Sequence, residues 1–414
     1  MSRSRRTAAL SRRRVLAGRG RHAAIAGTAV LAAALSACSG SGGADSGAGK
    51  ADMKNKAPMA ISVNATGGKA KAGEPVKVTV AAGKLTSVKV TDTKGGELAG
   101  RIAPDGRSWT SERNAAPGTS YKVEAKSNEG GSATSAFATD AADKVNKITI
   151  MPGKGGTYGV GQPISLVFDN PVKNKAAVER QLKVTTSNGT EGSWGWMKDY
   201  SGNDRVDWRP KDYWKAGTEV KLQMNLNGVD SGPGGGYFVR DYNTGFTIGK
   251  DQRITVDLDA HQLVMTRDGQ QVKKIPISAG TPGGQKASWL GKMVVMAKEG
   301  TIRMDSQTVG LGDAYDKMVD YSMRLTWSGM YAHAAPWNEG NFGVRNSSSG
   351  CVGMSTSNAS DLYAAVQPGD PFEVTGSGSK GKADVGNGYG EWNLSWADWQ
   401  AKSALASNQG GTDS

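Results

Sequence analysis

Short segments in which apolar and polar residues alternate recur from about residue 60 to residue 375, separated by Gly, Pro, Asn and Asp. Alternation with a period of two is the pattern of β-strands that bury one face. No long segment shows a helical period. We therefore predict a mostly β protein, and a chain of 414 residues has room for about two to four domains.

Two segments of the chain occur twice, which indicates a duplicated module. Residues 73–80 (GEPVKVTV) resemble residues 161–168 (GQPISLVF), and residues 118–123 (GTSYKV) resemble residues 217–222 (GTEVKL). The copies are 88 and 99 residues apart, which is the size of an immunoglobulin-like sandwich. We predict two tandem immunoglobulin-like β-sandwiches at residues 58–145 and 146–249. The core of the second is expected to contain Trp194, Trp196, Trp208 and Trp214.

A new run of alternating strands predicts a third domain at residues 250–376. The expected strands cover residues 254–258, 262–266 and 271–277, and the turn Asp268-Gly269 joins the last two. The clearest helix covers residues 358–366, with Ser357 as its N-cap, and a strand at 371–374 follows it. In the tail, residues 377–414, three tryptophans (Trp392, Trp396 and Trp399) fall on one helical face, and we expect the tail to pack on the third domain.

The N-terminus has the layout of a lipoprotein export signal. Residues 1–37 contain eight arginines, no acidic residue and a small-residue apolar run at 23–37, and residues 11–16 (SRRRVL) resemble a twin-arginine motif. Residues 35–38 (LSAC) look like a bacterial lipobox in which Cys38 is acylated, and residues 38–57 form a Gly/Ser-rich tether. We expect an extracytoplasmic protein anchored through Cys38 to the outer face of the cell membrane and facing the cell wall. Much of the net charge of +13 lies in the signal, so the charge does not indicate a nucleic-acid partner.

Cysteine and histidine are scarce, which narrows the candidate chemistry. If Cys38 is lipidated, Cys351 is the one free thiol in an oxidising compartment, and a thiol retained there suggests a chemical use. The exported part has two histidines, and His261 lies in a predicted hairpin among charged residues, so His333 is the candidate base. Small residues precede the thiol, so backbone N–H groups at Ser349, Gly350 and Cys351 can reach an oxyanion. Two histidines and one cysteine match no zinc ligand set, and we expect no metal or cofactor.

Four motifs resemble the catalytic domain of the L,D-transpeptidases, also called the YkuD family. They are residues 304–306 (MDS), 328–329 (SG), 333–337 (HAAPW) and 348–352 (SSGCV). The tail segment 391–396 (EWNLSW) is similar to that of actinobacterial members with two immunoglobulin-like domains. The resemblance implies that residues 250–376 form a β-rich YkuD-type catalytic domain, followed by the Trp-rich tail.

The resemblance also implies a reaction and a substrate. Cys351 would attack the carbonyl before the terminal D-Ala of a peptidoglycan tetrapeptide stem, with His333 as base, and an amine of a second stem would resolve the thioester into a 3–3 cross-link. Carbapenems are expected to acylate the same thiol. Residues 280–315 would include a lid over the cleft. The residues placed at the substrate are Met304, Tyr315, Ser328, Gly329, Tyr331, Trp337 and Gly353.

Three positions depart from the family pattern. Ser349 stands where the family usually has His, and a hydroxyl is not a cation at neutral pH. Ala334 stands where relatives often have Ser, so a different group, such as a backbone carbonyl, would orient the imidazole. Gly353 replaces a usual Asn or Arg. Two alternatives therefore stay open: an L,D-carboxypeptidase that uses the same thiol, and a non-catalytic, lipid-anchored cell-wall binding or scaffold protein.

Overall fold

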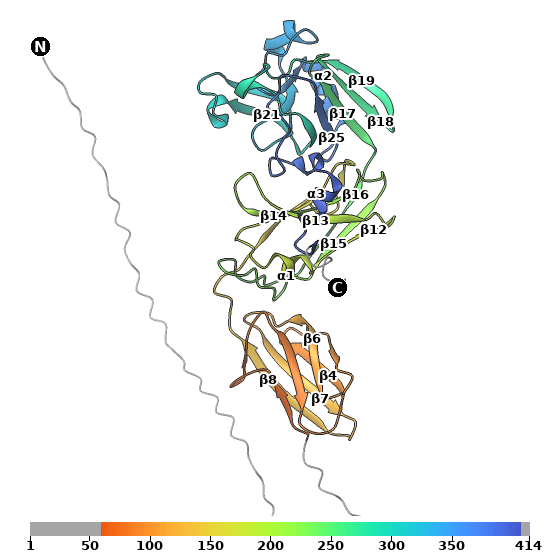
Figure 1. Ribbon diagram of the computed structural model, residues 1–414, viewed down its shortest axis with the longest axis vertical. Helices are drawn as coiled ribbons and strands as arrows, with labels where there is room; N and C mark the ends of the chain where they lie inside the picture. Colours follow the sequence, from red (N-terminus) through yellow and green to blue (C-terminus); the bar gives the residue numbers. More distant parts are fainter. Residues whose placement is uncertain (1–58, 407–414) are drawn as a thin grey trace, which may run out of the picture. The chain divides into compact units, whose positions relative to one another are not determined.

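The computed structural model describes residues 59–406, and the prediction of a mostly β protein is confirmed (Figure 1). The signal, the lipobox with Cys38 and the whole tether lie outside the described residues. Within residues 59–406, no helix is long and apolar enough to cross a membrane.

The first domain packs two four-stranded sheets around an apolar core. One sheet has the order β1-β3-β6-β5 and the other the order β2-β8-β7-β4. Val78, Val90, Val123 and Phe137 are buried between them. The strands are β1 (Ile61–Val63), β2 (Lys69–Ala70), β3 (Pro75–Val80), β4 (Leu85–Asp92), β5 (Gly100–Ile102), β6 (Ser108–Asn114), β7 (Ser120–Ser127) and β8 (Ser132–Thr139).

The second domain repeats this topology, so the predicted duplication is present in the fold. Its sheets have the orders β13-β14-β11-β9 and β10-β16-β15-β12. The repeated sequence segments occupy equivalent strands, because β3 corresponds to β11 and β7 to β15. The expected tryptophans are all buried in its core. The elements are β9 (Ile148–Met151), β10 (Thr157–Tyr158), β11 (Ile164–Phe168), α1 (Lys175–Glu179), β12 (Leu182–Thr186), β13 (Gly192–Lys198), β14 (Asp204–Pro210), β15 (Glu219–Met224) and β16 (Tyr242–Ile248).

The third domain combines a five-stranded sheet, β19-β18-β17-β25-β20, with a four-stranded sheet, β21-β22-β23-β24. Its core contains Val256, Met323, Val352 and Leu362. The elements are β17 (Gln252–Asp257), β18 (Gln262–Arg267), β19 (Gln270–Pro276), η1 (Gly284–Lys286), β20 (Gly291–Val294), β21 (Ala297–Asp305), η2 (Ser306–Val309), β22 (Asp316–Arg324), β23 (Tyr331–Ala334), η3 (Pro336–Asn341), β24 (Val352–Met354), α2 (Thr356–Ala365) and β25 (Pro371–Thr375).

The start of helix α2 differs from the prediction. Its N-cap is Ser355, whose hydroxyl accepts a hydrogen bond from the N–H of Asn358 at 3.2 Å, so the expected cap, Ser357, lies inside the helix. Ser355 has the extended backbone of an N-cap because it directly follows the end of β24.

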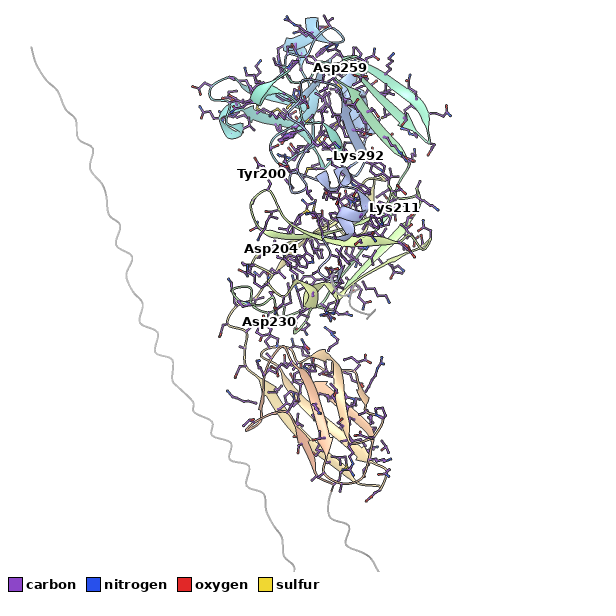
Figure 2. All side chains as sticks on the ribbon, viewed as in Figure 1. Tyr200, Asp204, Lys211, Asp230, Asp259 and Lys292 are labelled. Atoms are coloured by element: carbon purple, nitrogen blue, oxygen red, sulfur yellow. The ribbon has the colours of Figure 1, made fainter. Side chains whose placement is uncertain are left out.

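The first part of the tail contacts the third domain. Ser377 donates from its N–H and its hydroxyl to Asp259 at 3.1 and 2.5 Å. Asn393 pairs with the backbone of Lys292, accepting from its N–H at 2.7 Å and donating to its carbonyl at 3.1 Å. Figure 2 labels Asp259 and Lys292, the partners of Ser377 and Asn393.

The expected single helical face in the tail is wrong, because the tryptophans belong to two short helices, η4 (Gly390–Asn393) and α3 (Trp396–Gln400). The tail also crosses to the second domain, where Trp399 is fully buried and its indole N–H donates to the carbonyl of Ser193 at 3.0 Å. Gly195 makes room for it, since a Cβ there would lie 2.6 Å from the indole. The guanidinium of Arg209 lies 4.7 to 5.5 Å from the ring centroids of all three tryptophans, and these contacts join the tail to the second domain.

Candidate active site

Cys351 and His333 lie on one face of two adjacent parallel strands. Strand β23 pairs with β24 in a register that puts Ala332 opposite Val352 and His333 opposite Gly353. Cys351 directly precedes β24. Because alternate residues of a strand share a face, His333, Gly353 and Cys351 point the same way. Both candidate catalytic side chains are buried, at 5% exposed for His333 and 9% for Cys351.

The imidazole of His333 is oriented by a backbone carbonyl. Its Nδ1 lies 2.8 Å from the carbonyl oxygen of Ala334. A carbonyl can only accept, so Nδ1 carries the proton and Nε2 is left as an acceptor. Burial lowers the pKa of His333 below its ordinary value of 6.5, although the Ala334 carbonyl opposes this. The imidazole is therefore neutral at neutral pH and can accept a proton at Nε2.

The thiol of Cys351 is also neutral at rest. Burial raises its pKa to about 11, against the opposing effects of the Tyr331 backbone and of Lys380. The sulfur lies 3.7 Å from the carbonyl oxygen of Gly329, to which the thiol donates. Among the described residues no hydrogen bond joins the thiol to His333. Catalytic hydrogen bonds are often loose without substrate, so the thiol has to turn from Gly329 towards the imidazole before it reacts.

Two cavities flank the thiol and contain most of the predicted substrate residues. The larger, of about 200 Å³, is lined by Cys351, His333, Met304, Tyr315, Trp337, Ser349 and Gly353 among others. The smaller, of about 40 Å³, is lined by Ser328, Gly329 and Gly350, and again by Tyr315 and Ser349. Trp337 stacks on the imidazole at 6.1 Å between ring centroids, and the ammonium of Lys317 lies 4.4 Å from the Trp337 ring.

Tyr331 is the exception among the predicted substrate residues, because it lines neither cavity. Its hydroxyl bonds Glu299 at 3.1 Å, and the Arg324 guanidinium lies 4.7 Å from its ring. The side chain is therefore engaged in packing, and the part of Tyr331 that acts on Cys351 is its backbone.

The predicted oxyanion donors are not equivalent. Gly350 has φ of +124°, a backbone conformation that favours glycine, and its N–H already donates to the hydroxyl of Ser348 at 3.2 Å. The N–H of Cys351 has no partner within the described residues, so it is the donor that an oxyanion can use without breaking another bond. Ser349 lines both cavities.

Several residues at the site were not found from the sequence. Trp289 donates from its indole N–H to the hydroxyl of Ser328 at 3.1 Å, and Asn387 of the tail accepts from the Ser328 N–H at 2.8 Å. Lys380, also from the tail, lines the smaller cavity. The lid expected within residues 280–315 includes η2, and Val309 approaches Gly329 so closely that a Cβ on Gly329 would lie 2.7 Å from it. No sequence motif identifies these tail residues, because only the fold returns them to the site.

Within residues 59–406, no group of three or more His, Cys, Asp or Glu side chains is arranged to hold a metal ion. The site itself offers a thiol, a neutral imidazole and a backbone N–H donor. This set is suited to acyl transfer through a thioester.

Such a fold and site define a class of cysteine acyltransferases, and comparison with known proteins identifies the family. Residues 251–374 match the model of the L,D-transpeptidase catalytic domain, and residues 68–230 match that of a bacterial Ig domain. The chain is 34% identical over 340 residues to L,D-transpeptidase 2 of Mycobacterium tuberculosis (strain CDC 1551 / Oshkosh), covering 80% of this chain and 81% of the relative. The protein belongs to the L,D-transpeptidase family, as its motifs predicted.

Two further L,D-transpeptidases are similar in sequence to this chain. L,D-transpeptidase 5 of Mycobacterium tuberculosis (strain H37Rv) is 31% identical over 336 residues, covering 80% of this chain and 73% of the relative. A solved L,D-transpeptidase in complex with imipenem is 32% identical, covers 56% of this chain and 100% of that chain, and has a TM-score of 0.47.

Proposed function

We propose that this L,D-transpeptidase forms 3–3 cross-links in peptidoglycan through a thioester on Cys351. The main support for this proposal is that a neutral imidazole, with Nε2 free, lies on the same strand face as the thiol. His333 Nε2 takes the thiol proton as the sulfur bonds to the carbonyl carbon of the diamino acid in a tetrapeptide stem. The bond to the terminal D-Ala then breaks, and His333 returns the proton to the leaving amine.

The second half of the reaction uses the same residues in reverse. An amine of a second stem attacks the thioester carbonyl, His333 accepts the proton of that amine, and the sulfur leaves and regains a proton as the cross-link forms. The raised pKa of Cys351 explains why a base is needed, since with a pKa of about 11 only on the order of one thiol in ten thousand is ionised at neutral pH.

The oxyanion of each tetrahedral intermediate is stabilised by the N–H of Cys351, which has no competing partner among the described residues. The N–H of Gly350 can join it if the substrate displaces the Ser348 hydroxyl. Ser349 lies beside this position and offers a neutral hydroxyl where the family usually has an imidazole.

The same thiol is proposed to be the target of carbapenems. A β-lactam carbonyl can enter the larger cavity, where Cys351 and His333 are both exposed to it. One related L,D-transpeptidase has been solved with imipenem, which supports this proposal. Incubation with imipenem should add its mass once to the protein and not to Cys351→Ala.

The location of the enzyme is proposed to be the outer face of the cell membrane. The support is the signal-like segment 1–37 and the lipobox-like residues 35–38, which place an acylated cysteine at the start of the mature chain. Cys38→Ala should move the protein from the membrane fraction to the soluble extracytoplasmic fraction. Retention of that variant in the membrane would contradict lipid anchoring.

The proposed reaction is tested with disaccharide-tetrapeptide and mass spectrometry, using the purified protein and its Cys351→Ala variant. A cross-linked dimer, formed with loss of one D-Ala and only by the unmutated protein, is the expected result. D-Ala release without a dimer would replace the proposal by an L,D-carboxypeptidase. No product dependent on Cys351 from the folded protein would favour a wall-binding or scaffold role.

A further inference from the structure

The smaller cavity beside the thiol holds one charged side chain, Lys380. Of the residues that line it, only Lys380 carries a charge at neutral pH, because burial raises the pKa of Tyr315 to about 12 and keeps it neutral. Within residues 59–406, no carboxylate forms an ion pair with Lys380. An unpaired cation in a small recess next to a nucleophile is a candidate site for an anionic group.

The position of Lys380 is coupled to the residue before the nucleophile. Its N–H donates to the carbonyl of Ser288 at 3.1 Å, and the hydroxyl of Ser288 donates to the carbonyl of Gly350 at 2.8 Å. Its ammonium lies 5.7 Å from the ring centroid of Trp289, which itself binds Ser328. The side chain is exposed, so its ammonium can meet a ligand without a large desolvation cost.

The sizes of the two cavities suit the two sides of the scissile bond. A cavity needs about 10–15 Å³ to hold one water, so 40 Å³ accommodates a group of a few heavy atoms. The larger cavity, of about 200 Å³, has room for a diamino acid. Gly329 lines the smaller cavity and accepts the hydrogen bond of the Cys351 thiol, so this cavity lies directly beside the sulfur.

In a tetrapeptide stem, a single residue follows the scissile bond, and consecutive Cα atoms are about 3.8 Å apart. The terminal carboxylate is thus held within a short distance of the carbon that the sulfur attacks. If the body of the stem occupies the larger cavity, the leaving residue points into the smaller one.

We propose that Lys380 binds the terminal carboxylate of the donor stem in the smaller cavity and thereby selects stems with a free C-terminal acid. This inference rests on the proposed function, because it names the group by which that site recognises its donor. Lys380 lies in the tail, outside the four motifs, so the recognition is supplied by a segment that otherwise serves packing. Lys380 lowers the pKa of Cys351, against the effect of burial, and this is consistent with the closeness of its ammonium to the sulfur.

The first test compares anionic and neutral alkylating reagents. Rates of Cys351 modification by iodoacetate and iodoacetamide are measured for the protein, Lys380→Gln, Lys380→Arg and the control Lys382→Gln. Lys382 is exposed, two residues away, and does not line the cavity. The ratio of iodoacetate to iodoacetamide rates should fall about three- to fivefold in Lys380→Gln, the effect of one partly screened charge, and be kept in the other two variants.

The second test measures affinity for a tetrapeptide ending in D-Ala with either a free acid or an amide. Calorimetry in the Cys351→Ala background avoids turnover, so a failed cross-linking assay leaves both measurements interpretable. Lys380→Gln should weaken the acid about three- to fivefold and leave the amide unchanged, whereas Lys382→Gln should change neither. An unchanged preference for the acid in Lys380→Gln would overturn the proposal, even if the alkylation ratio fell, and unchanged values in both tests would overturn it completely.

Discussion

The structure predicts that the resting active site is a neutral thiol beside a neutral imidazole and not an ion pair. Burial raises the pKa of Cys351 from 9.0 to about 11, and no hydrogen bond from His333 offsets it among the described contacts. This rise in the pKa lowers the thiolate fraction at neutral pH about a hundredfold. A more basic thiolate is a better nucleophile, with a Brønsted slope of about 0.4–0.5, which restores about tenfold. Alkylation by iodoacetamide should therefore be about tenfold slower than for an unperturbed thiol.

The perturbation that tests this reasoning is His333→Gln. Burial, and not His333, sets the thiol pKa. The alkylation rate should therefore stay within about twofold of that of the unmutated protein, and the pH midpoint of alkylation within about half a pH unit. Cross-linking turnover should fall by about 10²- to 10⁴-fold, since the general base is lost. His261→Asn, which changes the other described histidine at a position of positive φ, is the matched control and should affect neither quantity.

The assay is the pH dependence of thiolate absorbance and of iodoacetamide reaction followed by mass spectrometry. A midpoint below about pH 8 that moves upward in His333→Gln would refute the neutral pair and show a thiolate stabilised by an imidazolium. Turnover itself should decline on acidification at a pH below 6.5, because burial lowers the pKa of His333 and the protonated ring cannot accept the thiol proton.

Three further predictions concern stability and backbone geometry. Burial raises the pKa of Asp370 from 3.8 to about 7, so its neutral form stabilises the fold at low pH and that stability is lost as pH rises from 3.8 through 7. The free energy of unfolding in urea, taken relative to that of Asp370→Asn, should therefore fall across this window by up to about 4 kcal/mol. Trp399→Ala should cost about 3–5 kcal/mol in urea unfolding because the indole is fully buried, against under about 1 kcal/mol for Trp327→Ala, which is 45% exposed. Gly350→Ala should lower the free energy of unfolding by about 1–3 kcal/mol, because φ of +124° is strained for alanine. The backbone change that relieves this strain would move Cys351 and so reduce turnover. Unchanged unfolding and turnover would contradict this.

Much of the site could be predicted from residue scarcity and motif. One thiol and two histidines in the exported part leave few nucleophile and base pairs, and Cys351 and His333 are the pair that the structure brings onto one strand face. The group that orients His333, the carbonyl of Ala334, could be predicted only as an unspecified backbone carbonyl. Every residue has a backbone carbonyl, so the sequence does not distinguish one from another. Tyr331 was predicted to contact the substrate, and its ring lies 4.7 Å from the guanidinium of Arg324, its partner on the neighbouring strand.

Local patterns determined the strands, the duplicated sandwich, the third domain and the chemistry of Cys351 and His333, because a period of two and a lone thiol are readable over a few residues. Tertiary structure alone decided that the tail joins two domains through Trp399, brings Lys380 to the smaller cavity and places Asn387 against Ser328, which lines that cavity. The physical reason is that these contacts join residues far apart in the chain, including Trp399 and Ser193, and are selected by complementary shape and buried hydrogen bonds. The thiol and imidazole are likewise neutral at rest because surrounding residues exclude water, a property of the packed molecule and not of either residue.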